Sequence, residues 1–334
     1  MKIWYQSMSR FQTKWKSYPK YLRQILDQVK DPDTEIELHG ITKVGGFADQ
    51  YRYLEYLETG EVMENVHTAM ERGFDAFLIG NIADPGLREC REIANFPVLG
   101  LCETSLHVAC IMGASFSLVT INEKFTPRII ENVVHYGLKE RLAAVNRMSI
   151  NRILNLDDGF EVADVQREIV GQFQAAAKAN TDAGAEVVIA AGGVVMALLA
   201  HAGVYTTPSG APILNGITTL VKMGEMAVKL DRIMGGTFTS KRLQYAPPGS
   251  DPPGSGRAFA TGQGTARPSD QKPQGAKSAC SASRRPRSPE RPPRTNSRGA
   301  QRASNFTATS PKAFRTCHPE LERKRAPPTR RPAA

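Results

Sequence analysis

A thiol, a carboxylate and two hydroxyls follow one another at Cys102-Glu103-Thr104-Ser105. They interrupt an apolar run that begins at Val98 and resumes at Leu106 with helical spacing. This pattern predicts a buried strand, a sharp turn and then a helix. In open α/β sheets, ligands bind beyond the carboxyl ends of the strands. Cys102 and Glu103 are therefore candidates for catalytic proton transfer.

Further polar or small residues follow other apolar runs that predict strands. The predicted substrate-binding residues are Ser7, Asn81, Thr104, Thr120, Gly192, Gly193 and Asn215. The Gly192-Gly193 turn would let backbone N–H groups approach an anion closely. Each of these residues has a structural alternative, because the same residue types form turns and tight strand–helix junctions.

Cys102 and Glu103 also have structural alternatives. Cys102 is the right size for a small buried residue at a strand end, and Glu103 would stabilise the first turn of its own helix. No further metal ligands cluster around them in the sequence, which predicts no metal site. The chain contains no GxGxxG or GxxxxGK[ST] segment, so nucleotide chemistry is not indicated, and we expect no cofactor.

Strands and helices alternate along the chain and would position these residues. Short apolar runs predict strands ending near Tyr5, Ile41, Ile79 and Leu101, and again near Thr120, Val145, Ala190 and Leu214. Helical stripes such as Leu22, Ile25 and Val29 separate them. This alternation is typical of parallel α/β architecture. Its repetition predicts two pseudo-symmetric parallel-sheet α/β domains with the site in the cleft between them.

The first predicted domain comprises residues 1–100 with 217–240, and the second comprises 101–216. From Pro247 onward the composition changes: residues 247–334 hold 18 Lys and Arg, 5 Asp and Glu, and 15 of the 22 prolines. The basic balance of the whole chain, +10, therefore comes from this segment. Such a composition predicts a disordered tail, which could bind nucleic acid nonspecifically or be a non-native extension.

The cysteine pattern and the apolar runs indicate the compartment. The five cysteines are scattered and form no CxxC pair, which argues against a disulfide framework and favours the cytoplasm. No apolar signal-peptide core follows Met1. The longest apolar run, 187–204, is divided by Gly192-Gly193, so it predicts a strand and a helix, and no membrane span.

Five segments carry a family resemblance through their order and spacing: DPGL at 84–87, PVLGLCE at 97–103, GASFSLVT at 113–120, GAEVVIAAGG at 184–193 and APILNGITTLVKMGEMAVKL at 211–230. With them, residues 1–240 resemble the aspartate/glutamate/hydantoin racemase superfamily, nearest its hydantoin racemase branch. The resemblance implies a cofactor-independent isomerase that exchanges the Cα proton of amino acids or hydantoins. One thiolate would remove the proton and a second thiol would return it on the other face.

The chain departs from that pattern at both thiols. Asn81 stands where the family has its first cysteine, and Gly192-Gly193 stands where the family has the second. Three readings stay open: proton exchange by Cys102 with Glu103, a one-thiol lyase or decarboxylase on the same scaffold, or a decayed binding protein. The implied partner is a small carboxylate, amino acid or hydantoin, with no membrane and a possible homo-oligomer.

Overall fold

The structure is a computed structural model that describes residues 1–11, 15–46, 51–150, 152–247 and 249. The predicted disorder and nucleic-acid binding of the tail fall outside these residues, apart from Pro247 and Gly249. Within the described residues, no helix is long and apolar enough to cross a membrane.

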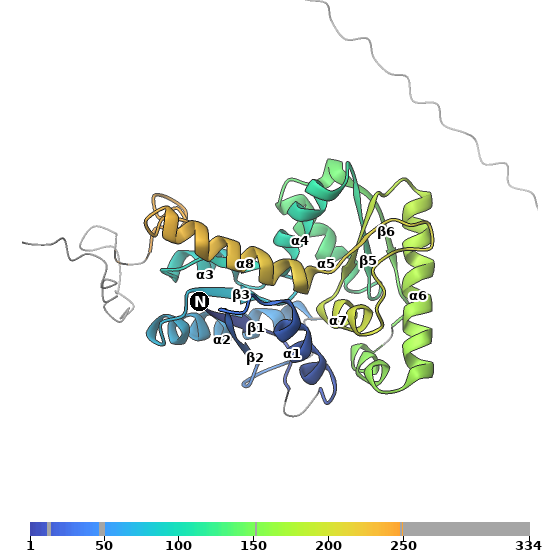
Figure 1. The fold of residues 1–334 in the computed structure, drawn as a ribbon, viewed down its shortest axis with the longest axis horizontal. Helices are drawn as coiled ribbons and strands as arrows, with labels where there is room; N and C mark the ends of the chain where they lie inside the picture. The colour runs from blue at the N-terminus through green and yellow to red at the C-terminus, as the bar shows by residue number, and fades with distance from the viewer. Residues whose placement is uncertain (12–14, 47–50, 151, 248, 250–334) are drawn as a thin grey trace, which may run out of the picture. The chain divides into compact units, whose positions relative to one another are not determined.

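The strands form two parallel sheets of four (Figure 1). The first sheet has the order β2-β1-β3-β4 and contains β1 (Lys2–Gln6), β2 (Glu35–His39), β3 (Ala76–Ile79) and β4 (Val98–Gly100). The second has the order β6-β5-β7-β8 and contains β5 (Phe116–Thr120), β6 (Leu142–Arg147), β7 (Val187–Ala191) and β8 (Ile213–Leu214). The same strand order occurs twice, so the predicted pair of similar α/β halves is confirmed.

The helices link successive strands. In the first half they are α1 (Tyr18–Val29), α2 (Arg52–Glu71) and α3 (Leu87–Ile93), and α4 (Leu101–Met112) leads to the second half. The second half contains α5 (Thr126–His135), α6 (Ala163–Asp182) and α7 (Gly193–His201), and α8 (Gly216–Ile233) follows β8. Two 3-10 segments, η1 (Lys139–Arg141) and η2 (Ile153–Phe160), lie on either side of β6.

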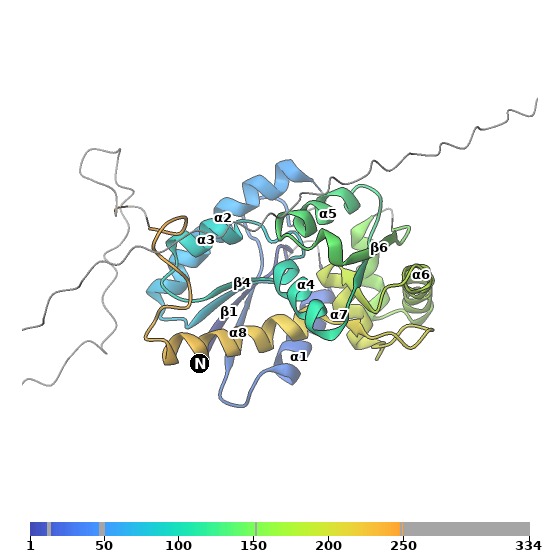
Figure 2. The ribbon, with the colours of Figure 1, turned by 90° about the horizontal axis from the view of Figure 1, so that it is seen from above.

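The first sheet lies between two layers of helices (Figure 2). Trp4 and Phe77 belong to the apolar cluster that includes Val62 and Val66 of α2. Ile3 and Leu78, one position along each strand, belong to the cluster that α1 and α8 help to form. Because neighbouring strand residues point to opposite faces, a sheet covered on both sides needs apolar residues at every position. This explains why β1 and β3 read as continuous apolar runs.

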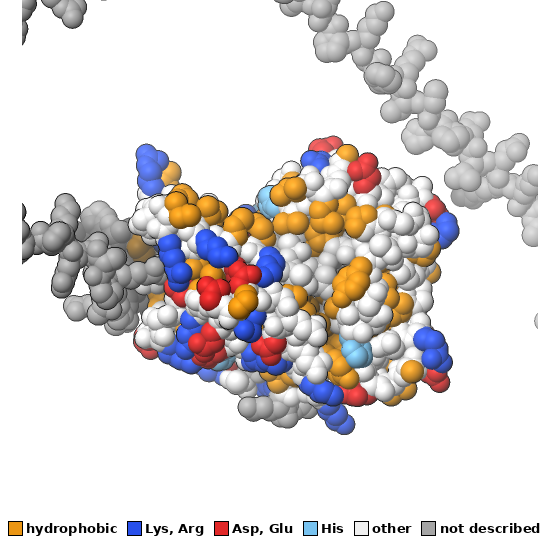
Figure 3. Space-filling model, in the orientation of Figure 1, with side chains coloured by type: hydrophobic (Ala, Val, Ile, Leu, Met, Phe, Trp, Pro, Cys, Tyr) orange, Lys and Arg blue, Asp and Glu red, His pale blue; other side chains and the backbone are white. Residues whose placement is uncertain are grey.

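Helix α8 follows the last strand of the second sheet but packs against β3 and β4 of the first. Lys222 and Lys229 pair with Asp31 at 2.7 and 2.8 Å, and the Glu225 carboxylate accepts from the Asp31 N–H at 2.6 Å. The Lys222 hydrogen bond is the main cause that lowers the pKa of Asp31 to about 2. Acidic and basic side chains accordingly gather on the α8 side of the first sheet (Figure 3).

The exact domain bounds, at residues 100 and 217, stay a prediction.

The sequence-based expectation of a turn at Cys102-Glu103-Thr104-Ser105 is wrong. All four residues lie in the first turns of α4, which begins at Leu101 directly after β4. Small polar residues indicate a turn because their side chains compete for backbone groups. Here the free N–H groups of the helix start are bound by Asp84, a residue from another part of the chain. No local pattern reveals such a cap.

Candidate functional site

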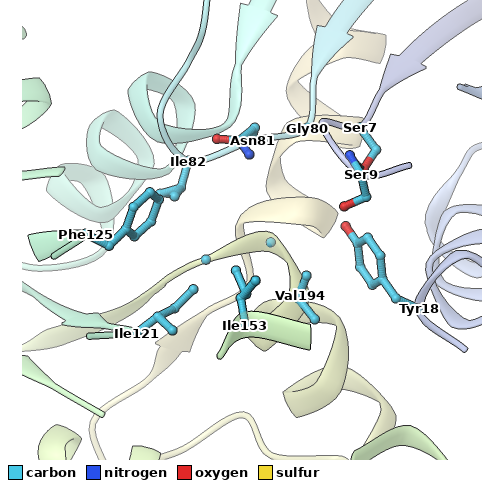
Figure 4. A pocket seen from close by; sticks show the side chains of 12 residues that line it. Ser7, Ser9, Tyr18, Gly80, Asn81, Ile82, Ile121, Phe125, Ile153 and Val194 are labelled. Atoms are coloured by element: carbon cyan, nitrogen blue, oxygen red, sulfur yellow. Dashed lines mark hydrogen bonds between the residues drawn. The ribbon is translucent and has the colours of Figure 1, made fainter. Parts of the chain in front are cut away.

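A cavity lies where four strands of the two sheets end (Figure 4). The first sheet contributes Ser7 and Ser9 after β1, and Gly80 and Asn81 after β3. The second contributes Ile121 after β5 and Gly192-Gly193 after β7. Figure 4 shows Ser7, Ser9 and Asn81 on one side of the cavity and Ile121, Ile153 and Val194 on the other. The complete lining is Ser7, Ser9, Tyr18, Gly80, Asn81, Ile82, Ile121, Phe125, Ile153, Gly192, Gly193 and Val194.

The cavity is small. It leaves about 20 Å³ for the centre of a water-sized sphere, which is room for about one water molecule. A ring such as that of a hydantoin does not fit this space. A ligand of that size therefore requires movement of the side chains that line the cavity.

The Asn81 side chain has a fixed orientation because the chain itself binds its amide oxygen. Its Oδ1 accepts from the Ala83 N–H at 2.7 Å, and its backbone oxygen accepts from the Asp84 N–H at 3.1 Å. In the described part of the chain, no hydrogen bond from Nδ2 is found. Because Oδ1 fixes the amide plane, Nδ2 is a hydrogen-bond donor with a fixed position at the cavity.

The second half holds the Asn81 loop in place through α5. The Asn132 amide nitrogen donates to the backbone oxygens of Ile82 and Ala83 at 3.2 and 3.0 Å. Arg128 donates to the same Ala83 oxygen at 2.7 Å and pairs with Glu55 at 2.6 Å. The loop after β3 is therefore fixed by side chains from α5, which lies beyond β5.

Helix α7 begins at the cavity with an open N-terminus. Three other helices at these strand ends have their first N–H groups bound by side chains: α1 by Asp157, α4 by Asp84 and α8 by Asn215. The residue before α7 is Gly192, which has no side chain to serve as a cap. The first N–H groups of a helix attract anions and carbonyl oxygens. Among the described residues, no side chain caps the start of α7.

Asp84 caps helix α4 from the loop after β3. Its φ of 51° lies in the left-handed region, which aspartate tolerates better than most residues. Oδ1 accepts from the Cys102 N–H at 2.8 Å, and Oδ2 accepts from the Glu103 N–H at 2.8 Å and from the Tyr136 hydroxyl at 2.7 Å. Burial raises the pKa of this carboxyl from 3.8 to about 7 and outweighs the opposing effect of these hydrogen bonds.

The geometry gives no support to catalysis by Cys102 and Glu103. Cys102 is 0% exposed and does not line the cavity, and burial raises the pKa of its thiol well above the usual value. A thiol that stays protonated is a poor base. The carboxylate of Glu103 forms a two-pronged ion pair with Arg91, which also donates to the Val98 oxygen. Both residues serve the junction between α3, β4 and α4.

The predicted substrate-binding residues divide into two groups. Ser7, Asn81, Gly192 and Gly193 come together in the cavity. The other three lie outside the lining. Thr104 is buried within α4, the Thr120 hydroxyl bonds the Thr126 hydroxyl at 2.5 Å, and Asn215 caps α8.

Ser9, Tyr18 and the apolar part of the lining were not predicted from the sequence. Ser9 lies two residues beyond Ser7 and was open to the same argument from strand ends. Tyr18 is the first residue of α1, so no strand end points to it. Ile121 and Phe125 look like ordinary core residues, because apolar spacing does not distinguish a cavity wall from a core.

Replacing Gly80 with alanine should destabilise the fold. A Cβ at Gly80 would lie 2.5 Å from the Tyr5 hydroxyl oxygen and closer still to two ring carbons. Tyr5 is 0% exposed, so its ring has no room to move away. We expect Gly80→Ala to lower the free energy of unfolding by about 3 kcal/mol in urea denaturation of the full chain.

Gly60→Ala is the matched control, because Gly60 lies within α2 and a Cβ there meets nothing within 4 Å. Removing a helical glycine should raise the free energy of unfolding by about 0.5–1 kcal/mol. Equal effects of the two substitutions would contradict the packing described at Gly80.

Metal ligands are also absent from the described site. In the ranges that the structure describes, no group of three or more His, Cys, Asp or Glu residues is arranged to hold a metal ion.

Comparison with known proteins identifies the family. The Asp/Glu/Hydantoin racemase family profile matches residues 15–224. The chain is 29% identical over 206 residues to a hydantoin racemase of Pseudomonas sp. (strain NS671), which covers 62% of this chain and 77% of that protein. It is 28% identical over 196 residues to a hydantoin racemase of Paenarthrobacter aurescens, which covers 58% of this chain and 77% of that protein.

Solved structures show the same fold. An allantoin racemase from Klebsiella pneumoniae superposes with a TM-score of 0.60 at 23% identity and covers 74% of this chain and 93% of its own. An allantoin racemase from Pseudomonas fluorescens superposes with a TM-score of 0.60 at 23% identity and covers 75% of this chain and 99% of its own. The repeated parallel sheets and the sequence match to residues 15–224 lead to one conclusion: the chain belongs to the Asp/Glu/hydantoin racemase family.

Proposed function

We propose that this racemase-like chain binds a hydantoin, or an amino acid or related small carboxylate, in the cavity between the two sheets. The observation that carries this proposal is the set of donors at one point: the open start of α7 and the Asn81 amide nitrogen. The hydantoin racemases among its relatives support the ligand class.

The lining offers several hydrogen-bond donors. Besides the α7 N–H groups and Asn81, the hydroxyls of Ser7, Ser9 and Tyr18 line the cavity. Such donors would hold the carbonyl or carboxylate oxygens that flank the reactive carbon. The same contacts stabilise the negative charge that develops on these oxygens when the proton leaves.

Proton transfer needs a base, and the described lining lacks an effective one. Its members include no thiol, carboxylate or imidazole, and burial raises the pKa of Tyr18 above its usual value. Following the family resemblance, we propose that Asn81 and Gly193 replace the two thiols. On this basis the chain binds the ligand and exchanges its Cα proton at most slowly.

A second candidate is a cofactor-independent isomerase of amino acids or hydantoins, which family membership favours. The observation in its support is the match of residues 15–224 to the racemase family. A one-thiol lyase or decarboxylase would need an accessible thiol, and the burial of Cys102 gives that alternative no support.

Ligand binding and proton exchange are measured separately. Calorimetric titration of the full chain with 5-methylhydantoin, L-aspartate and phenylmalonate should give binding of at least one compound. Proton NMR in deuterated water should then show no exchange of its Cα proton above the buffer rate. Rapid exchange would favour the isomerase, and no binding of any compound would contradict the proposed function.

A further inference from the structure

Tyr18 is the one titratable side chain among the described residues that line the cavity. It is 1% exposed, and burial raises the pKa of its phenol, with the hydrogen bond to Ser7 opposing this shift. The phenol therefore stays protonated near neutral pH and acts as a donor. Its hydroxyl points toward Ser7 and Ser9 (Figure 4).

The Tyr18 hydroxyl also lies close to the start of α7. A Cβ built on Gly193 would be 3.6 Å from the Tyr18 oxygen and 3.4 Å from the Gly80 oxygen. Tyr18 thus faces the point where the open helix start and the strand end of β3 approach each other. A ligand oxygen bound at α7 would lie within reach of this phenol.

A second tyrosine lies behind this point. Tyr5 of β1 is 0% exposed, and no hydrogen-bond partner of its hydroxyl is found within the described residues. The ring packs against Gly80, and the Tyr18 phenol is among the causes that raise the pKa of Tyr5. A buried hydroxyl without a partner is costly. One hydroxyl near this end of β1 therefore makes no hydrogen bond to the described residues.

Asp157 fixes the position of Tyr18 from the other half of the molecule. It belongs to η2, which follows β6, and is 7% exposed. Its carboxylate accepts from the backbone N–H groups of Lys16, Ser17 and Tyr18 at 2.8–3.2 Å. The start of α1 is therefore tied to the second half at the residue that carries the phenol.

We propose that Tyr18 is a specificity-determining residue that donates a hydrogen bond to a carbonyl oxygen of the ligand, and that Asp157 is the residue that positions it. This inference rests on the proposed function, because it concerns the same cavity. A neutral phenol selects an acceptor oxygen. The described lining contains no Lys, Arg or His, so the favoured ligand carries uncharged carbonyl groups.

The test compares oxygen and sulfur at the ligand. Thiocarbonyl sulfur accepts hydrogen bonds weakly, so the wild-type chain should bind 5-methylhydantoin more tightly than at least one of its 2-thio and 4-thio analogues. Tyr18→Phe should weaken binding of 5-methylhydantoin about 10-fold or more and remove the preference for oxygen. Asp157→Asn should reduce the same preference, because one amide oxygen cannot hold three N–H groups.

Tyr21→Phe is the matched control: it changes a phenol on the same helix that does not line the cavity. It should keep both affinity and oxygen preference. Circular dichroism checks that each variant is folded. If Tyr18→Phe does not fold, the oxygen preference of Asp157→Asn serves as the test. An unchanged oxygen preference in a folded variant would overturn the inference while the proposed function stands. Binding of L-aspartate or phenylmalonate without 5-methylhydantoin by the wild-type chain would overturn the inference alone, and no binding of any of the three compounds would overturn both.

Discussion

The double substitution Asn81→Cys and Gly193→Cys should give the chain racemase activity toward the hydantoin it binds. We expect exchange of the Cα proton to rise at least about 100-fold over the wild-type rate, because a positioned acid–base group contributes about 10²–10⁴-fold. Proton NMR in deuterated water and polarimetry of one enantiomer measure exchange and racemisation. The result would show that positions 81 and 193 flank the reactive carbon and that the wild-type chain lacks only the two thiols.

The structure accommodates a thiol at Gly193. A Cβ there meets no atom closer than 3.4 Å, whereas a Cβ at Gly192 would come within 2.7 Å of Ile121. A cysteine at position 193 would be the first residue of α7, and a helix N-terminus lowers the pKa of a thiol below its ordinary ~8.5. At Asn81 the cost is one hydrogen bond, from the Ala83 N–H.

The matched control is Asn81→Ser with Gly193→Ser, which has similar side-chain volumes and no thiol. It loses the Asn81 amide donor just as the cysteine pair does, so the two pairs should bind 5-methylhydantoin equally, but the serine pair should show only the wild-type exchange rate. Each single cysteine variant should also remain near that rate, because racemisation needs a proton carrier on both faces. Equal exchange by folded cysteine and serine pairs would contradict the idea that positions 81 and 193 flank the reactive carbon.

Much of the fold could be predicted from apolar patterns because both sheets are covered on two faces. Every residue of Val187–Ala191 is buried in β7, and an uninterrupted apolar run is what such a strand requires. The contact between Asp157 and the start of α1 could not be predicted, since these residues lie about 140 positions apart. Caps from distant loops leave no periodic signal in the sequence.

Part of the cavity lining could be predicted from strand ends for a physical reason. Ser7, Asn81 and Gly193 follow central strands, and the ends of central parallel strands meet at one place. Asn215 follows the edge strand β8, and its side chain turns back to cap its own helix. Cys102 lies after the edge strand β4 and inside a helix, where its thiol faces the core. The strand order, which the sequence does not reveal, distinguishes the residues that follow central strands from those that follow edge strands.

The free energy of unfolding should fall as pH rises from about 4 to about 7 because of Asp84. Its pKa is 3.8 in the unfolded reference and about 7 in the folded chain. Between these values the unfolded chain ionises while the folded chain keeps its proton, which favours unfolding. Each pKa unit corresponds to about 1.4 kcal/mol, so the full effect is at most about 4 kcal/mol. Above pH 7 both states are ionised and the loss is complete.

Asp84→Asn should remove this part of the pH dependence. An amide changes the hydrogen bonds with Cys102, Glu103 and Tyr136, but that change is the same at every pH. It therefore adds a constant offset, which cancels when stabilities at two pH values are compared. Urea denaturation of the full chain at pH 4.5 and 7.5 should show the variant gaining about 3 kcal/mol relative to the wild-type chain. Asp164→Asn, at an exposed position in α6, should show the same change in the free energy of unfolding between the two pH values as the wild-type chain. If Asp84→Asn also runs parallel, the carboxyl is ionised throughout this range, and its hydrogen bonds at the start of α4 outweigh the effect of burial.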